Sequence, residues 1–212
     1  LPAFGTTKVL SEDGVLVDQA RPMQIRDVLM HTSGLTYDFM SDNPVAQMYR
    51  DANLMHDPRR SLEAVIDELA AIPLAFQPGT RWHYSVGIDV AARLIEVISG
   101  QTLGQFLTER LLDPLGMVDT GFGVPPAKLD RLAAMYGLPD LVGEGYDAVQ
   151  LVTAAMSGFN ERIDVSATYP TDTPDVFQRG GLGLFSTGAD YLRFARMLLG
   201  NGELDGVRLL GR

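Results

Sequence analysis

Apolar residues recur at helical spacing in two long stretches of the chain. The first runs from Ser61 to Ile72 and ends at Pro73, and its buried stripe is predicted to be Leu62, Val65, Ile66 and Leu69. The second runs from Ile88 to Ile98, and Gly100 suits the left-handed residue that follows a helix end. Both stretches are therefore predicted to be amphipathic helices that bury one face.

Capping signals predict further helices. A Thr followed three residues later by Gln or Asp can satisfy free backbone N–H groups at a helix start. This pattern opens a helix over Thr102–Leu111, which Pro114 is expected to end, and another over Thr187–Leu199, closed by Gly200. Shorter helices are expected at Ile25–Met30 and Pro44–Leu54.

Between Gly137 and Gly181 the periodic pattern breaks down. Pro, Gly and Asp separate two short extended runs, Ala148–Thr153 and Arg162–Thr168, so residues 137–180 are predicted to form a variable loop or hairpin insertion. Such a segment either shapes a substrate mouth or serves as a solvated connector. The whole pattern predicts an α+β protein, mainly helical with few strands.

Composition and net charge limit the classes of molecule that the chain is expected to bind. The 212 residues are 46% hydrophobic, enough to bury the core of one domain or most of one. Lys and Arg number 17 against 27 Asp and Glu, for a net charge of -10, which disfavours nucleic acid and anionic membrane as partners. No apolar run approaches the roughly 18 residues of a membrane helix.

The residue types also restrict the chemistry. There is no Cys, so thiolate catalysis and Cys-based zinc sites are excluded. The three His, at positions 31, 56 and 83, form no paired ligand spacing, so we expect no metal. No Ser lies in a Gly-x-Ser-x-Gly elbow, neither Lys completes a phosphate loop, and Gly180, Gly181 and Gly183 do not match a dinucleotide fingerprint.

Four ordered phrases remain. They are His31-Thr32-Ser33-Gly34-Leu35; Phe76-Gln77-Pro78-Gly79-Thr80-Arg81-Trp82-His83-Tyr84-Ser85; Leu112-Asp113-Pro114-Leu115-Gly116-Met117; and Gly180-Gly181-Leu182-Gly183-Leu184-Phe185-Ser186-Thr187. In this order and spacing the chain resembles the serine β-lactamase-like superfamily: class C β-lactamases, the related carboxylesterases of the family VIII type, and penicillin-binding-protein-like peptidases. The resemblance covers nearly the whole chain and is weakest over residues 137–179.

The resemblance implies a serine acyl-transfer enzyme without cofactor. In the family a Ser in an SxxK helix attacks the carbonyl, a Lys and a Tyr handle protons, and backbone amides hold the oxyanion. Tyr84 matches that Tyr here and is the predicted catalytic residue; the alternative is an aromatic that only packs before a helix. A phenol ionises near pH 10 in water, so a catalytic Tyr needs a cation such as the SxxK lysine beside it.

Position 86 favours esters over lactams. Family β-lactamases tend to have Asn two residues after the Tyr, where its amide bonds the acylamino side chain, whereas this chain has Val86. We expect Val86 and Trp82 to contact the substrate, with Gly181, Leu184 and Ser186 bordering the site, although a tight turn would explain the glycines equally well.

Two phrases look like catalytic motifs but are expected to have structural roles. Ser41-Asp42-Asn43 spells a class A β-lactamase motif, but it directly precedes Pro44, where Asp or Asn caps a helix. His31 resembles a triad histidine, yet the resemblance implies that it belongs to a helix-ending turn.

The family's nucleophile is absent, because no Ser is followed three residues later by Lys, and the Lys-Thr-Gly or His-Thr-Gly motif is missing too. The start at Leu1 is neither an initiator Met nor a signal peptide. We therefore expect residues 1–212 to be a single partial β-lactamase-like domain, its terminal sheet segments absent, and to be inactive alone.

The expected activity of the full-length protein is hydrolysis of a small-molecule ester or amide, with esters preferred. A β-lactamase or D-alanyl-D-alanine peptidase is the alternative, and a non-catalytic binding relative is a further one.

Overall fold

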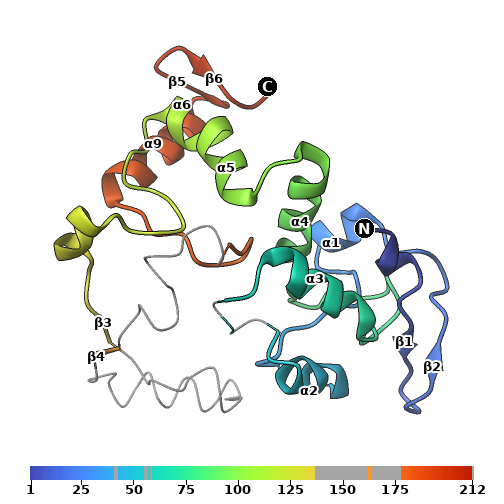
Figure 1. Cartoon of the computed structure of the whole chain (residues 1–212). Coiled ribbons are helices and arrows are strands. Elements are labelled where there is room, and N and C mark those ends of the chain that lie inside the picture. Colours follow the sequence, from blue (N-terminus) through green and yellow to red (C-terminus); the bar gives the residue numbers. More distant parts are fainter. Residues whose placement is uncertain (41–42, 55–56, 58, 137–161, 164–177, 212) are drawn as a thin grey trace.

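The computed structural model describes residues 1–40, 43–54, 57, 59–136, 162–163 and 178–211 (Figure 1). The elements, in chain order, are η1 (Pro2–Gly5), β1 (Val9–Leu10), β2 (Leu16–Val17), α1 (Ile25–Leu29), α2 (Pro44–Asp51), α3 (Leu62–Ala71), α4 (Gly87–Ser99), α5 (Leu103–Leu107), η2 (Thr108–Leu112), α6 (Asp113–Leu115), η3 (Pro126–Arg131), β3 (Met135–Tyr136), β4 (Arg162–Ile163), α9 (Gly188–Leu199), β5 (Glu203–Leu204) and β6 (Val207–Arg208). The strands pair as three antiparallel hairpins, β1 with β2, β3 with β4 and β5 with β6. The prediction of an α+β protein with few strands is confirmed.

The two strongest periodic patterns form helices where expected. Ser61 caps α3 by accepting a hydrogen bond from the Ala64 N–H at 3.2 Å. Gly100 ends α4 with φ of 72°, the left-handed conformation that glycine adopts without steric cost. The periodicity and the end signals agree here, which is why the bounds match within a residue.

The helix after Thr102 differs from its prediction. α5 gives way to the π-helical turn η2, and α6 then continues through Pro114 to Leu115, ending at Gly116 with φ of 64°. Pro114 lies in the first turn of α6, where its missing N–H needs no partner. Proline thus starts a helical turn here instead of ending one.

Asn43 and His31, from the two phrases that look catalytic, are a capping residue and a turn residue. Asn43 caps α2 by accepting from the Ala46 N–H at 2.9 Å, which confirms the capping interpretation of that residue. His31 follows α1 with φ of 56° and therefore forms the turn that ends this helix. α2 ends at Asp51, three residues before the predicted Leu54.

The C-terminal helix begins as predicted but ends differently. Thr187 caps α9 by accepting from the Asp190 N–H at 3.2 Å. Gly200 has φ of -78°, and the left-handed residue is Asn201 with φ of 54°. The following hairpin, which the sequence reading did not identify, turns at Asp205-Gly206, both with positive φ, a pair that two-residue hairpin turns prefer.

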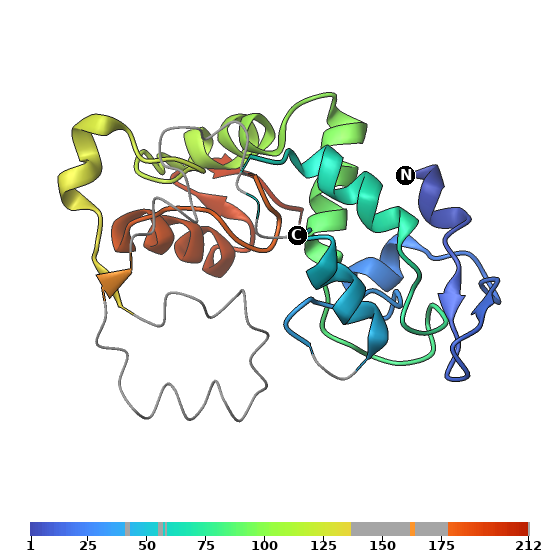
Figure 2. The same cartoon turned by 60° about the horizontal axis from the view of Figure 1, so that its bottom comes forward.

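Two clusters of buried apolar side chains hold the described elements together. The larger one joins α1, α2, α3 and α4 with the N-terminal segment, and its fully buried members include Val45, Tyr49, Leu54, Val65, Leu69, Leu74 and Val86. The smaller one consists of Leu112, Leu115, Met117, Met197 and Leu204 and packs α9 against α6 and β5. Figures 1 and 2 both show α9 beside α6, away from α1, α2 and α3 of the larger cluster.

Most of the predicted insertion at 137–180 lies outside the described residues, as do the run at 148–153 and most of the run at 162–168. Its described residues are 162–163 and 178–180, and Arg162 and Ile163 pair with Tyr136 and Met135, which precede the insertion. Within the described ranges, no helix is long and apolar enough to cross a membrane, and no three His, Asp or Glu side chains converge as a metal site.

Candidate active site

Tyr84 lies on a loop that is anchored along its length to the turn after α1. The Gly79 N–H donates to the Thr32 carbonyl at 2.7 Å, and the His83 N–H donates to the His31 carbonyl at 2.8 Å. The second and first phrases of the sequence are therefore adjacent segments in space. This pairing gives the loop before α4 a defined path.

Side chains on this loop alternate between the interior and the surface. His83 and Ser85 are buried, whereas Trp82 is 66% exposed and Tyr84 45% exposed. The His83 ring bonds the Thr36 hydroxyl at 2.9 Å, and the Ser85 hydroxyl bonds the His31 ring at 3.2 Å. Because successive residues of an extended segment point to opposite sides, anchoring His83 and Ser85 inward turns Trp82 and Tyr84 outward.

Aromatic rings contact Tyr84 on two sides. The ring centroid of His31 lies 5.0 Å from that of Tyr84, and the centroid of Tyr37 lies 5.1 Å from it. Burial raises the pKa of Tyr37 well above that of an ordinary phenol, and the charge of Asp89 adds to the rise. Tyr37 therefore stays protonated at neutral pH.

Trp82 lies at the edge of the same aromatic group. Its ring approaches His31 edge-on, with 6.3 Å between centroids. His31 therefore stands between Trp82 and Tyr84, and both predicted residues share one exposed surface.

Val86 does not share that surface. Its side chain is completely buried in the larger apolar cluster, and its backbone begins α4. The backbone turns into the helix at this position, so residue 86 points inward although residues 82 and 84 point outward. Val86 has no exposed surface in the described part of the chain, and its contact with the substrate stays a prediction.

Gly181 is brought close to the tyrosines by Asp89. The Asp89 carboxylate, on α4, accepts from the N–H groups of Gly180 at 3.0 Å and Gly181 at 3.3 Å. A methyl group at Gly181 would lie 3.2 Å from the Tyr37 hydroxyl oxygen. One at Gly180 would overlap the Ile88 carbonyl, so glycine is required for this close approach.

Leu184 and Ser186 contact a different part of the molecule. The Ser186 hydroxyl bonds the Thr120 hydroxyl at 2.8 Å. Leu184 lines a cavity of about 250 Å³ together with Gly104 and Phe122. Neither residue contacts Tyr84 among the interactions of the described residues, so their place in a substrate site remains a prediction.

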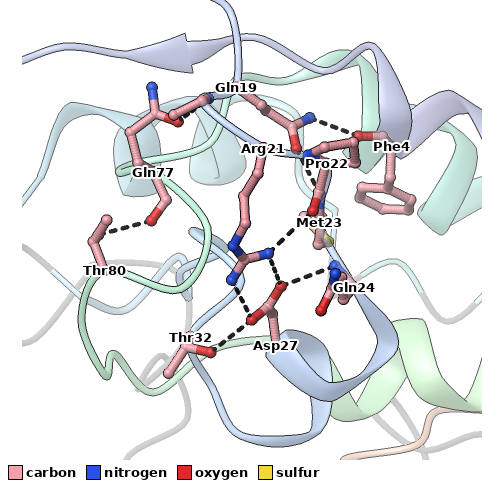
Figure 3. Close-up of polar contacts among 11 residues, drawn as sticks. Phe4, Gln19, Arg21, Pro22, Met23, Gln24, Asp27, Thr32, Gln77 and Thr80 are labelled. Carbon is pink, nitrogen blue, oxygen red and sulfur yellow. Dashed lines mark hydrogen bonds and ion pairs between the residues drawn. The ribbon is translucent and has the colours of Figure 1, made fainter.

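A buried ion pair supports the turn on which the tyrosine loop rests (Figure 3). The Arg21 guanidinium donates two hydrogen bonds to Asp27, at 2.7 and 2.8 Å, and holds the pKa of that carboxyl below its ordinary value. Asp27 also accepts from the Gln24 N–H at 2.9 Å and from the Thr32 hydroxyl at 3.3 Å. Since Thr32 holds Gly79, the pair fixes the start of the loop that carries Tyr84.

Sequence reasoning missed Tyr37, Asp89 and the Arg21–Asp27 pair. Asp89 had a readable signal, because a carboxylate between buried positions of an apolar helix is unusual. Tyr37 had none, since a lone aromatic after a turn is ordinary.

The fold agrees with comparisons to known proteins. A family model described as Beta-lactamase matches residues 13–210, and the chain belongs to this family. Protein Rv1367c of Mycobacterium tuberculosis is 38% identical over 99% of this chain and 48% of its own length, and lovastatin esterase of Penicillium rubens is 33% identical over 90% of this chain and 42% of its own. The solved structure of EstCE1, a hydrolase with promiscuous acyltransferase activity, superposes with a TM-score of 0.65 at 24% identity, over 98% of this chain and 52% of that one.

The chain spans about half the length of the curated relatives it matches. These relatives also include esterase EstB of Burkholderia gladioli, 30% identical over 88% of this chain and 47% of its own length.

Proposed function

We propose that the full-length protein is a serine hydrolase that transfers the acyl group of small carboxylic esters to water, with Tyr84 handling the proton. The observation that carries this proposal is the position of Tyr84: its hydroxyl-bearing ring is 45% exposed, yet it is held by an anchored loop between His31 and Tyr37. A proton-transferring group must be both accessible and fixed in orientation. Tyr84 meets both requirements.

The nucleophile must come from elsewhere in the full-length protein, because no Ser of this chain is followed three residues later by Lys. The serine oxygen would bond to the ester carbonyl carbon while its proton passes to the Tyr84 oxygen; the bond from that carbon to the alcohol oxygen would break, and Tyr84 would return the proton to the departing alcohol. Water would then add to the same carbon while its proton passes to Tyr84; the bond to the serine oxygen would break, the serine would regain the proton, and the acid would be released. This chain supplies the Tyr but no acyl-accepting Ser, so we propose that it is inactive alone.

An ester substrate is preferred for two reasons. Lovastatin esterase, at 33% identity, is named for cleaving an ester. Trp82, which contacts His31, and Phe39, which stacks on Tyr37, are exposed aromatic residues that suit an apolar acyl or alcohol group. A β-lactamase or D-alanyl-D-alanine peptidase remains the alternative enzyme, and a non-catalytic binding protein the alternative outside enzymes.

The decisive test removes the hydroxyl oxygen of Tyr84 and keeps its ring. In the full-length protein, Tyr84→Phe should lower kcat/KM for p-nitrophenyl butyrate by roughly 10²- to 10⁴-fold, the range for removing a general acid–base. Tyr191→Phe is the matched control, because Tyr191 is an exposed tyrosine on α9 and should leave activity unchanged. Activity of Tyr84→Phe within about threefold of wild type would make Tyr84 a packing residue.

Two further measurements separate the alternatives. Faster turnover of nitrocefin than of p-nitrophenyl butyrate would favour a β-lactamase, and absence of both activities would favour a binding protein. The 212-residue chain alone should hydrolyse neither substrate; covalent labelling of any of its serines by a fluorophosphonate would contradict this.

A further inference from the structure

Asp89 is a carboxylate in an interior position. Its side chain is fully buried on α4, between Val86 and Val90 of the larger apolar cluster. Burial raises the pKa of Asp89 above that of an ordinary carboxyl group. Removing a carboxylate from water costs free energy, and here two backbone N–H groups and the charge of the buried Arg179 offset part of that cost.

Asp89 contacts the glycine segment that lies beside Tyr37. Its Oδ1 accepts from the Gly180 and Gly181 N–H groups, 91 and 92 residues away in the chain. Its Oδ2 has no hydrogen-bond partner among the described residues. A methyl group at Gly181 would lie 3.3 Å from that Oδ2 and 3.2 Å from the Tyr37 hydroxyl oxygen, so both oxygens face the same small space beside Gly181.

Tyr37 continues the connection to Tyr84. Tyr37 is 8% exposed, and its ring centroid lies 5.1 Å from that of Tyr84. Phe39 also stacks on Tyr37, with 4.7 Å between centroids. Tyr37 is thus fixed by Phe39, by Tyr84 and by the glycine segment that Asp89 holds.

We infer that Asp89 is a positioning residue for Tyr84: by holding Gly180 and Gly181 against α4, it keeps Tyr37 in place against the Tyr84 ring. The inference rests on the proposed function, since it assigns Asp89 to the same site. Asp89 touches no reacting atom and acts through Tyr37. Losing it lets the tyrosine pair shift, and a displacement of about 1 Å at a catalytic group lowers the rate by as much as 10²-fold.

The test compares two substitutions in the full-length protein with p-nitrophenyl butyrate. Asp89→Leu removes the acceptor at similar size, and it should lower kcat by about 10- to 100-fold with KM changed less than about threefold. Asp89→Asn keeps an acceptor oxygen for the two glycines and should restore kcat to within about fivefold of wild type. Equal losses in both variants would overturn the inference, as would full activity of Asp89→Leu.

A double-mutant cycle separates positioning from general damage. In the Tyr84→Phe background, Asp89→Leu should cost less than about threefold, because the group it positions is already disabled. The matched control is Asp190→Leu, since Asp190 is also buried and accepts a backbone N–H, from Asp119 at 2.7 Å; its effect should multiply with that of Tyr84→Phe. Multiplication in the Asp89 cycle would refute the inference.

A surface variant decides the matter if Asp89→Leu does not fold. Gly181 is exposed, and Gly181→Ala would press the new methyl group against both the Tyr37 hydroxyl and Asp89. It should lower kcat by about 3- to 10-fold, an effect that vanishes in the Tyr84→Phe background. If Tyr84→Phe alone is harmless, the proposed function fails; if Tyr84→Phe is damaging and both Asp89 and Gly181 effects multiply with it, only the present inference fails.

Discussion

The Arg21–Asp27 pair tests how far a buried charge depends on its partner. Asp27 has a side chain only 4% exposed, and Arg21, 35% exposed, supplies two of its four hydrogen bonds. Arg21→Met keeps most of the aliphatic stem but removes the guanidinium. The carboxylate then retains only the Gln24 N–H and the Thr32 hydroxyl, and it stays buried.

The expected loss is about 2 to 3 kcal/mol in the free energy of unfolding. Breaking a buried pair by removing one partner costs about 3 to 5 kcal/mol. The value here should lie below that range because water reaches the Arg21 side, and solvent screening weakens the pair. Lys8→Met is the control, since the Lys8–Asp18 pair is exposed at 49% and 87% and is expected to contribute less than about 1 kcal/mol.

The pH dependence gives the sharper check. Arg21 lowers the pKa of Asp27 in the folded state, so the pair's contribution is present above the unfolded carboxyl pKa of about 3.9 and is lost as the pH falls through the folded value. Urea unfolding of the full-length protein, followed by circular dichroism, should therefore show the Arg21→Met deficit at pH 7 and a smaller one below about pH 4. A deficit no larger than that of Lys8→Met, or one independent of pH, would refute the reasoning.

Two further substitutions test the fold around the site. Gly34 has φ of 90°, and a methyl group there would overlap the Phe76 carbonyl, so Gly34→Ala should destabilise by more than about 2 kcal/mol, against about 1 kcal/mol for Gly14→Ala, which has φ of 76° and open space around it. Equal shifts in urea midpoint would show that the turn relaxes freely. Val86→Asn places an amide in the core and should cost about 1 to 3 kcal/mol without changing the ratio of ester to β-lactam kcat/KM; a ratio that moves toward the lactam would support the prediction that position 86 contacts the substrate.

The local pattern predicted the helices whose signals are redundant. For α3 and α4 the apolar period, the cap and the end residue agree, and the bounds match within a residue. Pro114 failed as an end signal because a proline also suits the first turn of a helix, and only the π turn before it decided which applies. The short hairpins were not predicted, because a strand of two residues is too short to show an alternation of apolar and polar positions.

The sequence by itself indicated the family and named Tyr84 as the candidate catalytic residue, because four ordered phrases carry that information in the spacing of residue types. Only the tertiary structure decided the surroundings of Tyr84. Val86 turned out to be buried although it lies two residues from an exposed tyrosine, since the loop enters a helix at that point. Asp89 meets Gly180 and Gly181 across about 90 residues of chain, and such a contact depends on how helices pack, which no local period or motif encodes.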